Sequence, residues 1–76
     1  MRYDVTFLAS ELVRVAQLAE RHTVVVRLDN DRYNAEFMGL VNEVRGMTDT
    51  ERLRLLVEGA ACRSSTGMSI LVKADD

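Results

Sequence analysis

The chain of 76 residues contains no proline, no tryptophan and only one cysteine, and aromatic residues make up 5% of it. A single cysteine cannot form an internal disulfide, which excludes a disulfide-stapled scaffold. The longest apolar runs have three residues, as at 24–26, against the roughly 20 that a membrane helix needs. The formal net charge of -2 and the pI near 5.3 lack the basic excess that nucleic-acid binding uses. We therefore expect neither a membrane nor a nucleic acid as partner.

The composition indicates one small globular domain spanning residues 1–76, because 47% of the residues are apolar and 29% are charged. No linker or internal repeat divides the chain. A domain of this size has a marginal core, so any site should be shallow and lie at the surface. No charged segment followed by an apolar stretch opens the sequence, and we expect a cytoplasmic protein that is not an enzyme.

The first third of the chain predicts a strand followed by a helix. Residues 2–8 alternate, with Tyr3, Val5 and Phe7 on one face. The next apolar residues recur at helical spacing, with Ser10 as the expected N-cap and Arg21 and His22 as cations near the negative end of the helix dipole. The apolar face of this helix comprises Leu12, Val15, Ala16 and Ala19.

The next segment predicts a β-hairpin. Residues 23–28 (TVVVRL) are rich in β-branched side chains and are typical of a strand. Residues 29–31 tolerate turn conformations, with Asn30 at the centre, and residues 32–36 resume an extended pattern.

The second half begins with a predicted helix and then becomes ambiguous. Phe37, Leu40, Val41 and Val44 have helical spacing, and Gly46 stands where helices commonly stop. Residues 52–57 alternate as in a strand, yet Thr48 and Glu51 have the spacing of a capping box, which indicates a helix. The tail fits either a strand through Met68, Ile70 and Val72 or a helix capped by Ser64 or Ser65.

Two α+β architectures follow. A strand at 52–57 gives the order βαββαβα, and a long helix at 37–58 with a last strand at 68–73 gives the βαββαβ order of ferredoxin-like domains. A helix through 52–57 would spread its apolar residues over a wide arc, and we therefore predict the strand, with Leu53 and Leu55 buried and Leu56 facing outward.

Residues 33–40 (YNAEFMGL) resemble the strand-to-helix passage of the HPr family, the histidine-containing phosphocarriers of the bacterial phosphotransferase system. Gly46 and Met47 resemble the end of that family's second helix, and Leu53, Leu55 and Gly59 fall where it has its fourth strand and the following glycine. The resemblance implies a single HPr-like domain with the βαββαβα order, an open-faced sandwich whose four-stranded antiparallel sheet carries its helices on one face.

The residues that perform the family's chemistry do not match. Leu8 stands at the position of the family's phosphorylated histidine, Ser10 at that of its arginine and Glu11 at that of its proline. Leu8 has no nucleophilic nitrogen, and Glu11 adds negative charge where a phosphoryl group would have to sit. Phe37 occupies the position of the family's regulatory serine. The resemblance therefore implies the fold and argues against phosphocarrier activity.

The remaining chemistry-bearing side chains are interpreted as structural. His22 lies at the end of a helix that repels phosphate, and Cys62 has no nearby catalytic partner in the sequence. Asp29 and Asp31 offer too few oxygen ligands for a calcium loop, so no metal site or cofactor is expected. The hydroxyls could be read as donors around an anion but are ordinarily caps: Ser10, Ser64, Ser65 and Thr66.

One surface is singled out as a binding face. If 52–57 and 23–28 are neighbouring strands, one face of the sheet carries three guanidinium groups among apolar side chains, a composition that is enriched at protein interfaces. A solvated sheet face is the alternative. The residues of this face are Arg27, Arg52, Arg54, Val25 and Leu56.

Three functional hypotheses result. The first is an HPr-like binding or regulatory protein without phosphocarrier activity, whose partner is a protein of the phosphotransferase system or another regulatory protein. The second is an active phosphocarrier that uses His22 or a hydroxyl as acceptor. The third is a ferredoxin-like module that forms a homo-oligomer through its sheet or binds a small ligand.

Overall fold

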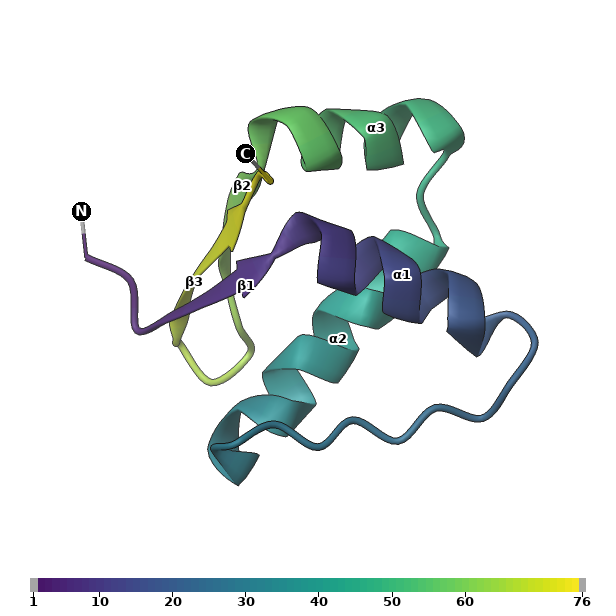
Figure 1. Cartoon of the computed structure of the whole chain (residues 1–76). Coiled ribbons are helices and arrows are strands. Elements are labelled where there is room, and N and C mark those ends of the chain that lie inside the picture. The colour runs from purple at the N-terminus through teal and green to yellow at the C-terminus, as the bar shows by residue number, and fades with distance from the viewer. Residues whose placement is uncertain (1, 76) are drawn as a thin grey trace.

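The computed structural model describes residues 2–75 and has an α+β architecture with a mixed three-stranded sheet and three α-helices (Figure 1). Strand β1 (Val5–Leu8) leads directly into α1 (Ala9–Ala19). After an extended segment and a 3-10 turn η1 (Asp31–Tyr33), two helices follow, α2 (Asn34–Arg45) and α3 (Asp49–Glu58). The chain ends in the hairpin of β2 (Ala60–Arg63) and β3 (Ser69–Lys73).

The sheet has the order β1-β3-β2, so its central strand is the last one in the chain. Strand β1 runs parallel to β3, with Phe7 beside Val72, and β2 runs antiparallel to β3, with Cys62 beside Ile70. A parallel pair needs a long crossover, and here all three helices lie between its strands. Figure 1 shows the helices on one side of this sheet.

The core lies between the sheet and the helices. Phe7 of β1 meets Phe37 of α2 edge to face, with ring centroids 5.1 Å apart, a favourable geometry for an aromatic pair. Within residues 2–75 the buried side chains are all apolar. They are Phe7, Ala9, Leu12, Val13, Ala16, Phe37, Leu40, Val41, Val44, Leu55, Ile70 and Val72.

Several sequence predictions are confirmed. Strand β1 lies within the predicted 2–8, α1 buries Leu12 and Ala16, and α2 ends at Arg45 with Gly46 as its C-cap. The tail, which the sequence left open between strand and helix, forms strand β3, whereas the predicted βαββαβα order needed a helix there. The helix boundary of α1 is different, because Leu8 and not Ser10 is its N-cap, and the helix ends at Ala19 before the expected cations.

The predicted hairpin of strands 23–28 and 32–36 is wrong. Asn30 accepts a hydrogen bond from the backbone N–H of Arg32 at 3.2 Å, which starts the 3-10 turn, and α2 already begins at Asn34. The Asn34 side chain accepts from the N–H of Leu28 at 2.8 Å. Local side-chain bonds to the backbone therefore turn the chain into a helix instead of a second strand. Residues 23–28 form a drawn-out segment (Figure 1) that belongs to no sheet within residues 2–75.

The predicted strand at 52–57 is also wrong, since α3 covers it. The capping box is present: Thr48 Oγ1 accepts from the N–H of Glu51 at 3.2 Å, and Glu51 Oε1 accepts from the N–H of Thr48 at 3.2 Å. Leu55 is buried as predicted, at 7% exposure, but Leu53 is 61% exposed. The order is neither the HPr-like βαββαβα nor the ferredoxin-like βαββαβ, and no four-stranded sheet forms within residues 2–75.

Gly59 lets the chain pass from α3 into β2. Its φ of 68° lies in the region that glycine adopts without strain, and a Cβ there would overlap the carbonyl oxygen of Val72 in β3. The glycine that the sequence analysis assigns to a strand exit is therefore a helix C-cap, placed against the sheet's central strand.

Candidate functional site

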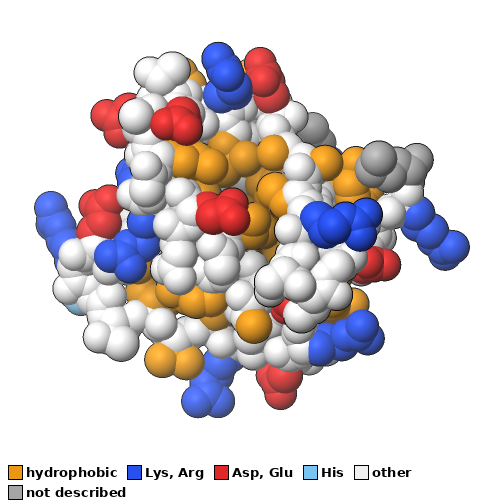
Figure 2. All heavy atoms as spheres, turned by 180° about the vertical axis from the view of Figure 1, so that it is seen from behind, with side chains coloured by type: hydrophobic (Ala, Val, Ile, Leu, Met, Phe, Trp, Pro, Cys, Tyr) orange, Lys and Arg blue, Asp and Glu red, His pale blue; other side chains and the backbone are white. Residues whose placement is uncertain are grey.

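A groove separates α2 from the β2–β3 hairpin and has a volume of about 280 Å³. We call it the α2–hairpin groove. Figure 2 shows that hydrophobic side chains gather in a hollow near the centre of the face opposite to that of Figure 1. The residues that line the groove are Ala35, Glu36, Gly39, Leu40, Glu43, Cys62, Arg63, Ser64, Ser65, Thr66 and Ile70.

The wall that α2 contributes is explained by helical periodicity. Glu36, Gly39 and Glu43 stand at i, i+3 and i+7, so all three lie on one face of the helix. Gly39 adds no side chain there, and a Cβ built on it would have no atom within 4 Å. The groove is open at this position because the middle of the wall has no side chain, and a carboxylate stands on either side.

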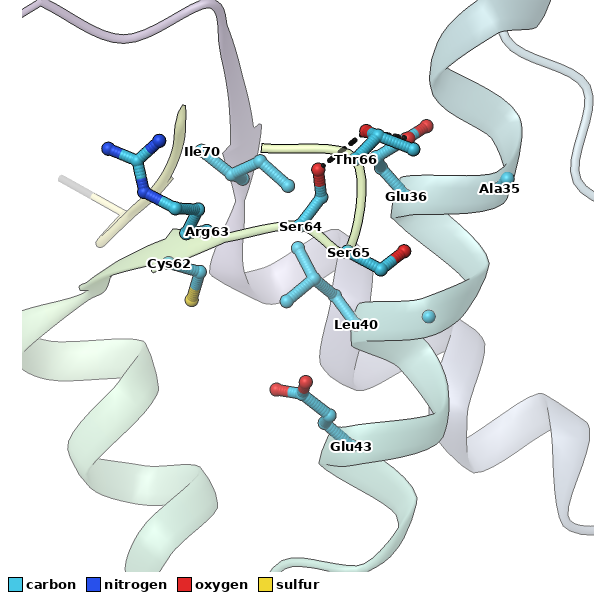
Figure 3. Close-up of a pocket in the computed structure, with 11 residues that line it drawn as sticks. Ala35, Glu36, Leu40, Glu43, Cys62, Arg63, Ser64, Ser65, Thr66 and Ile70 are labelled. Carbon is cyan, nitrogen blue, oxygen red and sulfur yellow. Dashed lines mark hydrogen bonds between the residues drawn. The ribbon is translucent and has the colours of Figure 1, made fainter. Parts of the chain in front are cut away.

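The opposite wall is the hairpin loop, which its own hydrogen bonds fix. The N–H of Ser64 donates to the carbonyl of Met68 at 2.9 Å, and the N–H of Met68 donates to Ser64 Oγ at 3.0 Å. Ser64 Oγ and Thr66 Oγ1 are 2.9 Å apart. The hydroxyls therefore order the loop, and Thr66 then reaches across to α2 (Figure 3).

Glu36 is the polar group at the end of the groove where the loop meets α2. Its Oε1 accepts a hydrogen bond from Thr66 Oγ1 at 3.3 Å. Its Oε2 is buried and has no hydrogen-bond partner among the described residues. A buried acceptor without a partner loses its hydration without compensation, and such a group calls for an explanation. A donor placed in the groove would satisfy this oxygen.

The groove is acidic because its one cationic side chain turns away. Figure 3 shows Arg63 pointing away from α2, and its Nη1 donates to the carbonyl of Gly67 at 2.8 Å. Glu43 projects toward Cys62 from the other end of the groove (Figure 3). Burial, and then the charge of Glu43, raises the pKa of the Cys62 thiol above its ordinary value of 9.0. Cys62 therefore stays protonated at neutral pH, which agrees with its interpretation as a structural thiol.

The five residues selected as a binding face do not form one. Val25 and Arg27 lie on the extended segment, whereas Arg52, Arg54 and Leu56 lie on α3. Val25 is 72% exposed, and Leu56 packs partly against the core. The sheet face that would have joined them requires a strand at 52–57, and that segment is helical.

Arg52 connects three helices through hydrogen bonds and an ion pair, and it is not a free surface charge. Its Nε donates to the carbonyl of Val44 at 3.1 Å and its Nη2 to the carbonyl of Arg45 at 3.3 Å, so it satisfies carbonyls at the end of α2. The same Nη2 lies 3.4 Å from a carboxylate oxygen of Glu20, after α1. The side chain of Arg52 is only 16% exposed. Its charge thus joins the ends of α1 and α2 to the start of α3.

The positions matched to the HPr site are spread over different environments. Leu8 is the exposed N-cap of α1, and Ser10 and Glu11 follow in its first turn. Phe37 is a core residue, and His22 is exposed beyond the end of α1. None of these residues lines the α2–hairpin groove.

Sequence reasoning missed the groove for an identifiable reason. It placed Glu36 on a strand and interpreted Ser64, Ser65 and Thr66 as caps rather than as donors around an anion. In the structure, Thr66 donates to a carboxylate that belongs to the protein itself. The spacing of Glu36, Gly39 and Glu43 was the available signal, but it points to a site only once α2 is known to begin at Asn34.

Comparison of the chain with models of protein families, with curated proteins and with solved structures found no match. Among residues 2–75, the helices are all too short or too polar to cross a membrane.

Proposed function

We propose that this chain is a small binding module without phosphocarrier chemistry, and that its α2–hairpin groove receives a basic side chain of a protein partner. The observation that carries the proposal is the buried, unpartnered Oε2 of Glu36 at the end of an apolar groove. A lysine ammonium or an arginine guanidinium supplies the donor that this oxygen lacks, and charge-assisted hydrogen bonds are the strong ones.

The apolar floor of the groove fits the stem of such a side chain. Leu40, Cys62 and Ile70 are apolar residues of the groove lining, and lysine and arginine bury their methylene stems along apolar surface while the charged end meets a polar group. Cavities for drug-sized ligands run from about 300 to 1,000 Å³. At about 280 Å³, the groove is the size for one long side chain rather than for a large cofactor.

The absence of phosphocarrier chemistry rests on the side chains at the start of α1. Leu8 carries no nitrogen that could accept a phosphoryl group, and Glu11 lies in the first turn of the helix. We expect no added phosphate after incubation with phosphoenolpyruvate and the enzyme that charges HPr, as measured by intact mass. A relation to the HPr family stays a prediction from the sequence alone, because the strands that it implied at residues 32–36 and 52–57 are helical in the structure.

The binding test is an NMR titration with three probes. A blocked peptide with one lysine should shift the amide signals of the groove, and the same peptide with norleucine, which has the stem without the charge, should not. A free alkyl diamine is the third probe. If the diamine binds as tightly as the lysine peptide, the ligand is a small amine and the proposed protein partner is wrong.

Substitutions locate the site. Glu36→Gln should weaken lysine-peptide binding by about tenfold, because one charged hydrogen bond is lost. Glu58→Gln is the matched control, since Glu58 is an exposed carboxylate on α3 outside the groove. Gly39→Leu should block the groove, whereas Gly39→Ala should preserve binding and strengthen α2. Equal binding by all four variants would contradict the proposal.

A further inference from the structure

The segment 23–28 runs between α1 and η1, and no strand of residues 2–75 lies beside it. Its side chains alternate, with Val24, Val26 and Leu28 half-buried and the odd-numbered residues exposed. Val26 and Leu28 pack against the core, so one face of the segment is anchored to the helices. Figure 1 shows the segment running beside the helices, on the side away from the sheet. It therefore has the shape of a strand but cannot join β1, β3 and β2.

The backbone N–H and C=O groups in the middle of this segment form no hydrogen bond within residues 2–75. Within residues 2–75, hydrogen bonds hold its two flanks: the N–H of His22 donates to the carbonyl of Leu18, and the N–H of Leu28 donates to Asn34. The backbone groups of residues 23–27 have no protein partner among the described residues. A row of unpaired N–H and C=O groups on an extended chain is a template for another strand.

We propose that a second copy of this chain pairs with residues 23–28 in an antiparallel arrangement centred on Val25. Fixed flanks and β-branched side chains hold the segment extended before pairing, so little conformational entropy remains to be lost. An antiparallel pair related by a two-fold axis uses the same surface on both copies and closes at the dimer. It also covers Val25, which is 72% exposed, with Val25 of the second copy.

Charge and side-chain direction select this register. Opposite residues of an antiparallel pair share a face, so pairing Val25 with itself keeps every half-buried residue on the inner face. It also brings the flank of each copy that carries Arg21, in the turn after α1, toward the flank of the other copy that carries Asp29, and neither side chain has an ion pair within residues 2–75. A parallel in-register pair would instead bring like charges together at both flanks, Arg21 with Arg21 and Asp29 with Asp29.

The pairing surface includes two residues of the predicted binding face. Val25 and Arg27 lie on the outer face of this segment, with Arg27 opposite Thr23 of the second copy. The pairing surface is separate from the α2–hairpin groove, because no residue of 23–28 lines the groove. Self-association and groove binding can therefore be tested independently.

The experiment is sedimentation equilibrium over a series of protein concentrations, combined with amide hydrogen exchange. We expect a monomer–dimer equilibrium, with exchange of the amides within 23–27 slowing as concentration rises. Val25→Pro removes the backbone N–H at the centre of the pair and fixes φ away from the antiparallel-strand value, and it should abolish the dimer. Its far-UV circular dichroism should match that of the unchanged chain, since Val25 contributes nothing to the core.

A charge exchange tests the register without touching the backbone. Arg21→Asp or Asp29→Arg alone should weaken the dimer by about tenfold, because each sets like charges opposite each other. The double variant should restore wild-type association, and Arg54→Asp, an exposed charge change on α3, should leave it unchanged. A monomer at all concentrations would overturn the proposal. So would a dimer that survives Val25→Pro, or a double variant that does not recover.

Discussion

Helix α3 and the extended segment 23–28 differ in how their backbone groups are satisfied. Each is a short surface element that rests on the core through alternate or spaced apolar residues. In α3 the Thr48–Glu51 capping box closes the start, and the N–H of Gly59 bonds to the carbonyl of Leu55 at the end. Within residues 2–75, the backbone of the segment has hydrogen bonds only at its flanks. Capping hydrogen bonds thus satisfy backbone groups at both ends of α3 within the chain. The backbone groups of the segment would be paired only in the proposed dimer.

The largest loss of stability should follow from substituting Gly59, where the chain leaves α3 and enters β2. Gly59→Ala places a Cβ against the backbone of β3 as well as requiring a positive φ, so the sheet or the helix end must move. We expect a loss of about 3 kcal/mol in the free energy of unfolding, measured by urea denaturation.

Gly67→Ala is the matched control for that substitution. Gly67 also has a positive φ, at 89°, but a Cβ there would have no atom within 4 Å. Only the backbone conformation is then strained, and we expect a loss of about 1 to 2 kcal/mol. Equal losses for the two glycines would mean that contact with β3 does not fix the end of α3.

The next largest effect tests which face of α3 is buried. Leu55→Ala should destabilise the chain by about 2 kcal/mol, at the low end for core leucines, because α3 buries only this residue. Leu53→Ala should change stability by less than about 0.5 kcal/mol, as Leu53 is 61% exposed. Thermal or urea unfolding measures both stability changes. Similar losses for the two variants would favour an alternating strand at 52–57 over α3.

A third pair of variants compares a cap with a strand former. Thr48→Ala removes the side chain that accepts from the N–H of Glu51 and should destabilise the chain by about 1 kcal/mol. Val25→Ala lowers strand propensity in the exposed middle of 23–28 and should alter monomer stability by less than about 0.5 kcal/mol. Denaturation at low protein concentration prevents dimer formation from contributing to the measured stability. A larger loss for Val25→Ala than for Thr48→Ala would contradict this prediction.

These two regions also explain what the sequence could predict. The alternation in β1 and the helical spacing in α1 and α2 are local properties, and the structure confirms them. The partner of an extended segment is not local, so the hairpin prediction failed at residues 32–36. At 52–57 the alternation and the capping box conflicted, and hydrogen bonds that satisfy orphan backbone groups outweighed side-chain alternation.

Strand β2 and the α2–hairpin groove show the limit of the same reasoning. The residues of β2 (AACR) are few, and most are exposed, so they carry no alternation of their own. The strand exists because β3 lies beside it and Gly59 directs the chain there. The groove likewise depends on packing of the 64–67 loop against α2, through Thr66 and Glu36. Neither contact can be found from spacing along the chain.

The smallest predicted effect is a pH dependence confined to α3. The hydrogen bonds from the Thr48 backbone N–H, and then from its side chain, lower the pKa of Glu51 below its ordinary value of 4.5. A lowered folded-state pKa means that the stabilisation is present above pH 4.5 and is lost as pH falls through the depressed value. Acidification should therefore fray the first turn of α3, seen in the amide signals of residues 48–51, while those of 23–27 stay unchanged. Glu51→Gln keeps an acceptor oxygen but cannot titrate, and it should remove the effect. Fraying of that variant over the same pH range would assign the change to another carboxyl group.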